Sequence, residues 1–313
     1  MSDVVLVQLA LLAGGVVSLY AGAELLVAGA ARLALGIGLR AVTVGVTVVA
    51  LATTAPELFV AVVGAVDVST DIGLGAVVGS NVANVGLVLG LAALIRPLPV
   101  GSVVMRRHVP FMLFSAVLLL VLGADGTLSR LDGLVFLATL GAFTALLLYY
   151  ANVDPPTIDD PDAGSGIELR DVFFVVAGLI ALVIGSRWLI AGGRGILSAM
   201  GFSDLFIGLT VLAIGTSLPE LAASVVGAIR DETAFSIGNV VGSNIYNVLA
   251  VLGIVAVVVP IPVEPSVVRF EIPAMVGFSA LMVALMYHGR RLSRIDGAIL
   301  VVCYVGFVYL LLP

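Results

Sequence analysis

Hydrophobic residues run along this chain in long continuous stretches separated by short polar segments. About 17–25 apolar residues suffice to cross the hydrocarbon layer of a bilayer. We expect ten spans, of which the fourth and ninth are the shortest: residues 4–31, 41–66, 72–95, 109–123, 131–150, 172–192, 205–229, 235–259, 272–287 and 295–312. Strands of a membrane barrel would alternate apolar and polar positions instead. The pattern therefore predicts an all-α polytopic membrane protein with ten transmembrane helices.

One part of the chain occurs twice. Residues 45–90 and 208–253 align at an offset of 163 without a gap, and about half of the positions are identical. Residues 128–133 (LSRLDG) also match residues 292–297 (LSRIDG) at an offset of 164. Each half holds five spans, an odd number, so the second half must insert upside down. We expect two inverted five-helix repeats, residues 1–150 and 172–313, joined by an acidic cytoplasmic linker at 151–171.

Polar residues inside the duplicated apolar segments form two patterns. In the second and seventh spans an Ala, a Thr and a Glu spaced i, i+3 and i+7 share one helix face: Ala50, Thr53 and Glu57, and again Ala213, Thr216 and Glu220. In the third and eighth spans a Ser and an Asn spaced i and i+4 share a face: Ser80 and Asn84, and again Ser243 and Asn247. Polar groups in a membrane helix are costly, so their duplication predicts a site built from both copies.

Prolines and glycines should shape the backbone around these polar residues. Pro56 and Pro219 cannot donate a backbone hydrogen bond, and each clashes with the carbonyl four residues earlier. We therefore expect the carbonyls of Ala52 and Gly215 to be freed beside the Thr and Glu side chains. Small residues four apart should also let helices approach closely; these are Gly75 and Gly79, with Gly238 and Gly242 in the second copy.

The donor chemistry points to a cation. The four helices offer two carboxylates, hydroxyls, amide oxygens and carbonyls, and they offer no imidazole or thiolate. Such all-oxygen sites suit hard cations, namely Ca²⁺, Na⁺ or Mg²⁺. Blander interpretations exist, because a membrane Ser or Thr often bonds its own helix, an Asn often joins helices, and a Glu can pair structurally. Duplication of all of them at matched depth favours a site.

Composition restricts the function classes. The chain is 61% hydrophobic and 11% charged, with a mean hydropathy of +1.25, which excludes a soluble enzyme. The sequence shows no phosphate loop or nucleotide motif, so we expect an ion gradient as the energy source. The single Cys303 allows no disulfide within the chain, and His108 and His288 are too few for a histidine metal cluster. We expect no enzyme activity, no cofactor, no nucleic acid partner and no obligate protein partner.

The arginines predict the orientation in the membrane. With ten spans, one side of the membrane collects Arg32, Arg40, Arg96, Arg106, Arg107, Arg170, Arg230, Arg290, Arg291 and Arg294, and the other collects Arg130, Arg194 and Arg269. The positive-inside rule places the larger group on the cytoplasmic side of the cell membrane and both termini outside. Glu24 and Arg187 occupy equivalent positions in the two halves, and we interpret them as anchoring residues.

The motifs resemble those of a known family. Gly215-Thr216-Ser217-Leu218-Pro219-Glu220 and Gly242-Ser243-Asn244-Ile245-Tyr246-Asn247 are similar to the α-repeats of the cation/Ca²⁺ antiporter superfamily, specifically the prokaryotic Na⁺/Ca²⁺ exchangers. The resemblance covers essentially the whole chain and implies alternating access with Na⁺ and Ca²⁺ as transported ions. The ion-binding residues that it implies are Ala50, Thr53, Thr54, Glu57, Ser80, Asn84, Ala213, Thr216, Ser217, Glu220, Ser243 and Asn247.

Two departures from the family pattern affect the expected site. Thr54 stands where a Ser is usual, and both Asn84 and Asn247 are amides where one position is often Asp. We still expect electrogenic exchange of about three Na⁺ for each Ca²⁺, as the resemblance implies. An H⁺/Ca²⁺ antiporter that protonates the same two glutamates is the alternative, and a structural or receptor-like membrane protein without transport is a third class.

Overall fold

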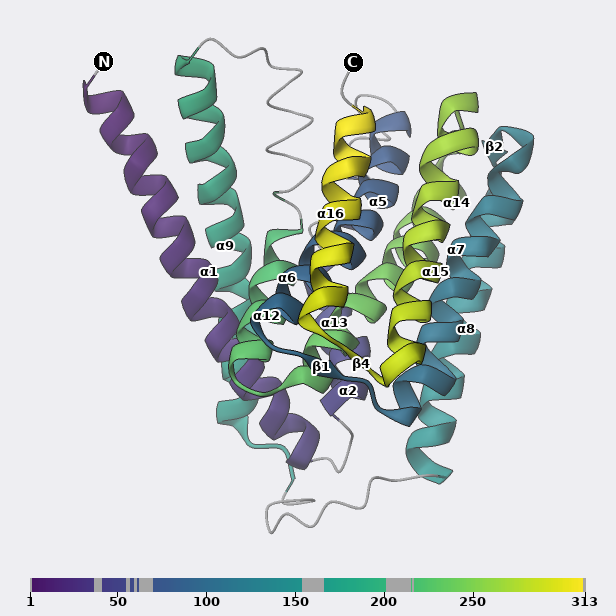
Figure 1. Ribbon diagram of the computed structural model, residues 1–313, viewed down its shortest axis with the longest axis horizontal. Helices are drawn as coiled ribbons and strands as arrows, with labels where there is room; N and C mark the ends of the chain where they lie inside the picture. The colour runs from purple at the N-terminus through teal and green to yellow at the C-terminus, as the bar shows by residue number, and fades with distance from the viewer. Residues whose placement is uncertain are drawn as a thin grey trace.

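The computed structural model describes residues 2–36, 41–54, 57–58, 61, 70–153, 166–200, 215 and 217–311. Most of these residues are helical, because a backbone in lipid must satisfy its own N–H and C=O groups. The longer helices are α1 (Ser2–Gly36), α5 (Thr70–Ala83), α7 (Val109–Leu122), α8 (Arg130–Val153), α9 (Leu169–Ala199), α12 (Leu218–Ile229), α13 (Thr233–Tyr246), α15 (Ile272–Gly289) and α16 (Arg294–Leu311) (Figure 1). The shorter ones are α2 (Ala41–Val44), α3 (Ala50–Thr53), α6 (Gly90–Ile95) and α14 (Gly253–Val258), with a 3₁₀ turn, η4, at Gly123–Asp125.

Eight segments within the described residues are long and apolar enough to cross a membrane. They are Val5–Leu33, Leu74–Ile95, Val104–Asp125, Arg130–Tyr150, Leu169–Gly193, Thr233–Val258, Val267–Gly289 and Arg294–Leu311. They correspond to eight of the ten spans expected from the sequence. The other two, 41–66 and 205–229, fall partly outside the described residues. Their described parts include α2, α3 and the apolar helix α12.

Wide π-helical turns interrupt the helices. They are η1 (Gly45–Val49), η2 (Asn84–Leu89), η3 (Val104–His108), η6 (Asn247–Leu252) and η7 (Val267–Glu271). Four of them lie at equivalent places in the two halves, η2 with η6 and η3 with η7. The turns η3 and η7 end just before Pro110 and Pro273, where the missing N–H interrupts the regular hydrogen-bond ladder. The turns η2 and η6 begin at the two asparagines expected to bind ions, and π-turns within α-helices are frequent at functional sites.

Two short antiparallel strand pairs join the halves of the chain. Strand β1 (Leu98–Pro99) pairs with β4 (Arg291–Leu292), and β2 (Thr127–Leu128) pairs with β3 (Ile261–Pro262). By sequence offset β1 is equivalent to β3 and β2 to β4. In Figure 1, β1 and β4 lie at the lower end of the molecule and β2 at the upper end. Elements that are equivalent in sequence therefore lie at opposite ends.

The repeated LSR-x-DG motif caps a helix in each half. The Ser129 N–H donates to Asp132 Oδ2 at 2.8 Å, and the Asp132 N–H donates back to Ser129 Oγ at 3.3 Å. Ser293 and Asp296 make the same two bonds at 2.7 and 3.2 Å. Both pairs are capping boxes, which satisfy backbone donors that the first turn leaves free. The motif is thus explained by the starts of α8 and α16.

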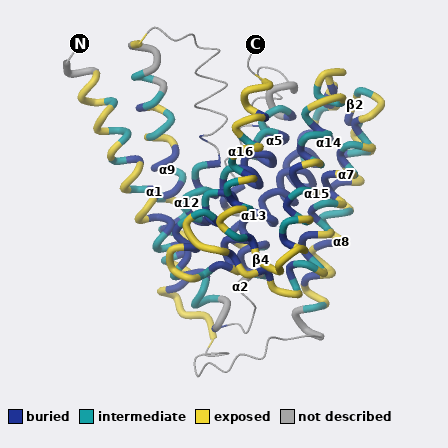
Figure 2. Tube along the Cα trace, in the orientation of Figure 1, coloured by how far each residue is buried: buried dark blue, intermediate teal, exposed yellow. Residues whose placement is uncertain are grey.

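Two long helical segments form the centre of the molecule, and the others surround them. In the most apolar part of Leu74–Ile95 and of Thr233–Val258, 72% and 89% of the residues are buried. In the segments that begin at Val5 and at Arg294 the share is 17% each. Figure 2 shows the same gradient, with buried residues in the middle and exposed residues on the outer helices. Exposed apolar side chains on the outer helices suit contact with lipid, so the centre is the part that excludes it.

Helices α1 and α9 pack as a close pair along one side of the molecule (Figure 1). A Cβ added at Gly22 would lie 2.8 Å from the Gly178 carbonyl oxygen, and one added at Gly178 would lie 2.7 Å from the Gly22 carbonyl oxygen. Only glycine allows this approach. Glu24, interpreted from the sequence as an anchoring residue, forms an ion pair with Arg230 beyond the end of α12, whereas Arg187 is exposed.

The expected close approach of small residues is found at Gly242. A Cβ added there would lie 2.6 Å from the Val46 carbonyl oxygen and 2.5 Å from Ala50 Cβ, so α13 rests directly on η1 and α3. At Gly75 and Gly79 an added Cβ would meet no described atom within 4 Å. Residues 209 and 213, which the repeat offset makes equivalent to Val46 and Ala50, lie outside the described residues, so close packing at Gly75 and Gly79 stays a prediction.

Replacing Gly242 by Ala should destabilise the protein, because the methyl group would force α13 away from Ala50 and Val46. Overpacking of this kind costs about 1–3 kcal/mol. The measurement is the midpoint of thermal unfolding in detergent. Gly277→Ala is the matched control, since a Cβ at Gly277 in α15 would meet no described atom within 4 Å. Equal midpoints for the two variants would contradict the close contact.

Candidate functional site

The polar residues of both duplicated motifs lie at helix ends and junctions in the buried centre. Thr53 ends α3 and Thr54 follows it, whereas Ser217 precedes α12 and Glu220 lies in its first turn. Asn84 and Asn247 begin η2 and η6. Ten of the twelve predicted site residues are described, and none of them is more than 4% exposed: Ala50, Thr53, Thr54, Glu57, Ser80, Asn84, Ser217, Glu220, Ser243 and Asn247. Ala213 and Thr216 lie outside the described residues.

Six buried oxygen atoms of these residues have no hydrogen-bond partner among the described groups. They are Thr54 Oγ1, Glu57 Oε2, Asn84 Oδ1, Ser217 Oγ, Glu220 Oε2 and Asn247 Oδ1. They form three pairs at the repeat offset of 163. Leaving one buried polar atom unpaired costs about 1–3 kcal/mol. Six such atoms, matched between the halves, mark a place where the protein keeps oxygens available.

The two glutamates supply the negative charge of the site. Ser243 Oγ donates to Glu220 Oε1 at 3.5 Å, which leaves Glu220 Oε2 unpaired. Glu57 lies close enough to Glu220 for the two charges to repel each other. Two carboxylates held together out of water need a counter-charge, because burial removes the solvation that ions have in water.

Four asparagines join the two central helical segments in a symmetric network, which we call the asparagine clasp. Asn81 Nδ2 donates to the Asn244 carbonyl and Asn244 Nδ2 donates to the Asn81 carbonyl, each at 3.3 Å. Asn84 Nδ2 donates to Asn244 Oδ1 at 3.1 Å, and Asn247 Nδ2 donates to Asn81 Oδ1 at 3.0 Å. The clasp therefore occupies the amide nitrogens of Asn84 and Asn247 and leaves their oxygens free.

Sequence reasoning missed Asn81 and Asn244 as contributors to this site. Both belong to the repeated Gly-Ser-Asn-x-x-Asn motif, so the duplication itself carried the signal. The face argument selected Ser and Asn at i and i+4 and passed over the Asn between them. That Asn points to the other central segment, where it orients the predicted ligand of the opposite half.

The carbonyl of Gly215, which was expected to be freed by Pro219, has a partner. Ser186 Oγ on α9 donates to it at 2.6 Å. The carbonyl that cannot bond to the proline thus accepts a hydrogen bond from a hydroxyl on another helix. No sequence signal linked Ser186 to Gly215. Asn239 is a further residue that sequence reasoning missed; its buried amide contacts Thr53 and the Glu220 carbonyl.

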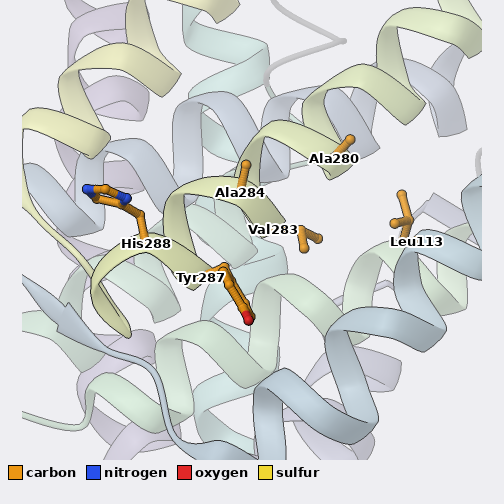
Figure 3. A pocket seen from close by; sticks show the side chains of 6 residues that line it. All are labelled: Leu113, Ala280, Val283, Ala284, Tyr287 and His288. Carbon is orange, nitrogen blue, oxygen red and sulfur yellow. The ribbon is translucent and has the colours of Figure 1, made fainter.

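Among the described residues, no three His, Cys, Asp or Glu side chains group as a metal cluster. The donors at the centre are instead two carboxylates with neutral hydroxyl and amide oxygens, a set that matches hard cations. A separate groove of about 420 Å³ lies between α7 and α15 and is lined by Leu113 of α7 and by Val283, Tyr287 and His288 of α15 (Figure 3). None of the predicted site residues lines this groove.

Comparison with known proteins identifies the family. The sequence matches the family described as "Sodium/calcium exchanger protein" over residues 7–149 and 171–312. It is 36% identical over 270 residues to the putative antiporter CaxA of Alkalimonas amylolytica, covering 83% of this chain and 84% of the relative. It is 29% identical over 298 residues to the sodium/calcium exchanger MaX1 of Methanosarcina acetivorans, covering 83% and 85%.

A solved structure shares the fold. The sodium-calcium exchanger NCX_Mj, soaked with 10 mM Na⁺ and no Ca²⁺, superposes with a TM-score of 0.87 and 28% sequence identity, covering 98% of this chain and 100% of that one. Family match, relatives and fold agree with the resemblance seen in the two polar motifs. The chain belongs to the sodium/calcium exchanger protein family.

Proposed function

We propose that this protein exchanges Na⁺ for Ca²⁺ across the membrane by alternating access, with the ions bound between the two halves of the chain. The observation that carries the proposal is the set of six buried, unpaired oxygens in three repeat-related pairs. Oxygens in this number, with two carboxylates and no nitrogen or sulfur ligand proposed, suit Ca²⁺ and Na⁺. The names of the relative MaX1 and of NCX_Mj support the same ions.

The ion-binding residues in this proposal are the twelve predicted from the sequence. Ala213 and Thr216 enter by their equivalence to Ala50 and Thr53, whose hydroxyl lies 3.3 Å from the Ala50 carbonyl oxygen. The remaining ten are buried together at the centre. Ca²⁺ and Na⁺ compete for overlapping oxygens around Glu57 and Glu220.

Coupling follows from the cost of burying charge. An empty site holds two carboxylates in a medium of low dielectric, and enclosing them without a cation is unfavourable. The switch between outward and inward access is therefore easier when cations neutralise the site. One Ca²⁺ balances two carboxylates, whereas about three Na⁺ leave a net charge near +1, which makes the exchange electrogenic.

The orientation is part of the proposal. Several of the arginines expected on the cytoplasmic side lie at the end of the molecule where β1 pairs with β4: Arg96 bridges Asp231 at 2.7 Å and Arg294 donates to the Ile95 carbonyl at 3.3 Å. By the positive-inside rule this end lies on the cytoplasmic side of the cell membrane. The start of α1 and the end of α16 lie at the other end (Figure 1), so both termini are outside in this proposal.

Glu57→Gln and Glu220→Gln should each reduce ⁴⁵Ca²⁺ uptake into Na⁺-loaded proteoliposomes at least tenfold, since a charge-assisted contact is worth about 1.5–3 kcal/mol. Glu264→Gln, which makes the same substitution at an exposed position between β3 and η7, should leave uptake unchanged. Uptake that survives both site substitutions would contradict the assignment. Choline-loaded vesicles with an imposed pH gradient test the alternative, because uptake driven by that gradient alone would assign the two glutamates to H⁺/Ca²⁺ exchange.

Ca²⁺ uptake against Na⁺ efflux should respond to membrane potential. Moving about three Na⁺ out for each Ca²⁺ in carries one positive charge outward, and 100 mV acts on one charge with about 2.3 kcal/mol. An inside-positive potential, set by external K⁺ and valinomycin, should speed uptake, and an inside-negative potential should slow it. The same K⁺ concentrations without valinomycin separate the potential from binding of K⁺. Equal rates at all potentials would establish electroneutral exchange.

Asn81→Ala and Asn244→Ala should each raise the KM for Ca²⁺, because either change releases one amide nitrogen that the asparagine clasp holds. The effect of the double variant should be smaller than the sum of the two, since both residues act in one network. Ser115→Ala is the control for loss of a buried hydroxyl, as Ser115 bonds the Met112 carbonyl of its own helix at 2.7 Å. Additive effects would show that the two asparagines act independently.

A further inference from the structure

Asn239 is a buried amide of α13 that contacts both halves of the candidate site. Its side chain is 0% exposed and lies one helical turn before Ser243. Asn239 Oδ1 accepts from Thr53 Oγ1 at 3.4 Å. Its Nδ2 donates to the Glu220 carbonyl at 3.3 Å and to Ser224 Oγ at 3.0 Å. One amide thus connects α13 to α3 and to the first turn of α12.

The chemistry of these partners determines which way the amide faces. The Glu220 backbone carbonyl can only accept a hydrogen bond, so the Asn239 nitrogen must face it. The Asn239 oxygen then faces Thr53, and the Thr53 hydroxyl must be the donor. Thr53 is one of the predicted ion ligands.

The duplication breaks at this amide. At the offset of 163, the position equivalent to Asn239 is Ala76, and the position equivalent to Ser224 is Ala61. The residues around Ala76 and Asn239 otherwise repeat, including the Gly-Ser-Asn-x-x-Asn motif. The first half therefore offers no equivalent amide, and the bridge is specific to the side of the site that Thr53 shares with Glu220.

Counting protons and lone pairs shows what the amide changes. The Ala50 carbonyl already accepts the Thr54 N–H at 3.0 Å, and its second lone pair faces the Thr53 hydroxyl at 3.3 Å. Thr53 has one proton for two acceptors, the Ala50 carbonyl and Asn239 Oδ1. The Ala50 carbonyl is a predicted cation ligand, whereas Asn239 Oδ1 is the acceptor that the cation does not need.

We propose that Asn239 is a positioning residue that accepts the hydrogen bond of the Thr53 hydroxyl when a cation binds. The Ala50 carbonyl then keeps one lone pair for the cation, and the lone pairs of Thr53 Oγ1 turn toward it. The bond from the amide nitrogen to the Glu220 carbonyl keeps the amide oxygen directed at Thr53. Without Asn239 the Thr53 proton occupies an oxygen that the cation requires. The inference rests on the proposed function, because it concerns the same ion site.

Asn239→Ala should raise the KM for Ca²⁺ about tenfold, the effect of one lost hydrogen-bonding partner at a buried site, with Vmax changed less than KM. The matched control is Ser236→Ala. Ser236 is also fully buried on α13 and donates to the Ser224 carbonyl at 2.8 Å, but no hydrogen bond links it to a predicted ion ligand among the described residues. The control should lower the unfolding midpoint without raising the KM. A similar KM for both variants would make Asn239 a structural link between helices.

A double-mutant cycle tests the proton directly. Thr53→Val keeps the side-chain shape and removes the proton, so adding Asn239→Ala to Thr53→Val should change the KM less than about twofold. A persistent tenfold effect in that background would overturn the proposal and assign the role of Asn239 to the Glu220 backbone. If Asn239→Ala does not fold, Asn239→Leu serves in the same cycle, because it fills the volume and offers no acceptor.

Calorimetric titration of Ca²⁺ into the purified protein separates the two hypotheses. If the wild-type protein neither binds Ca²⁺ nor takes it up against Na⁺, the proposed function fails. If the wild-type protein binds and transports Ca²⁺, and Asn239→Ala binds it with the same affinity, only the role of Asn239 fails. Weaker binding by Asn239→Ala and unchanged binding by Ser236→Ala would support it.

Discussion

Buried oxygen atoms without hydrogen-bond partners are the constraint around which the centre of this molecule is arranged. Their parent side chains are otherwise anchored: the clasp occupies the amide nitrogens of Asn84 and Asn247, and Ser243 bonds the other oxygen of Glu220. A loosely packed interior would leave donors and acceptors unpaired at random. Here six of the nine buried side-chain atoms left over among the described residues are oxygens in repeat-related pairs, and an environment without water makes each one costly unless a cation meets it.

The surrounding helices make this arrangement possible by keeping lipid and bulk away. Gly242 lets α13 rest on α3 and η1, which brings Ala50 and Thr53 to the oxygens of the second half. The π-turns begin at Asn84 and Asn247 and widen the helix where each side chain must face inward. The outer helices, whose apolar side chains suit lipid, contribute the frame and none of the twelve predicted ligands.

Periodicity and duplication predicted much of this architecture, and their limits have physical causes. Apolar runs predicted the eight long segments, and the repeat offset selected the residues that lie together at the centre; their role as ligands stays a prediction. Contacts between halves were beyond such reasoning, because Asn81 meets Asn244 and Ser186 meets Gly215 only after the chain has folded. Close packing at Gly75 and Gly79 stays a prediction, because the positions equivalent to the partners of Gly242 lie outside the described residues.

Inverted duplication explains why the site is made of pairs, and it also shows where pairing must fail. If the halves were equivalent at every position, each ligand would have a twin in the same surroundings. Ala76 and Asn239 break that equivalence among the residues that surround the predicted ligands, while the predicted ligands themselves remain paired. Two ions of different charge place unequal demands on the same oxygens, because a divalent cation needs more negative charge around it than a monovalent cation does. Asn239 Oδ1 is an acceptor on one side of the site only, and the Thr53 hydroxyl can donate either to it or to the Ala50 carbonyl. This choice gives otherwise equivalent carbonyls different affinities for a cation without adding a charge.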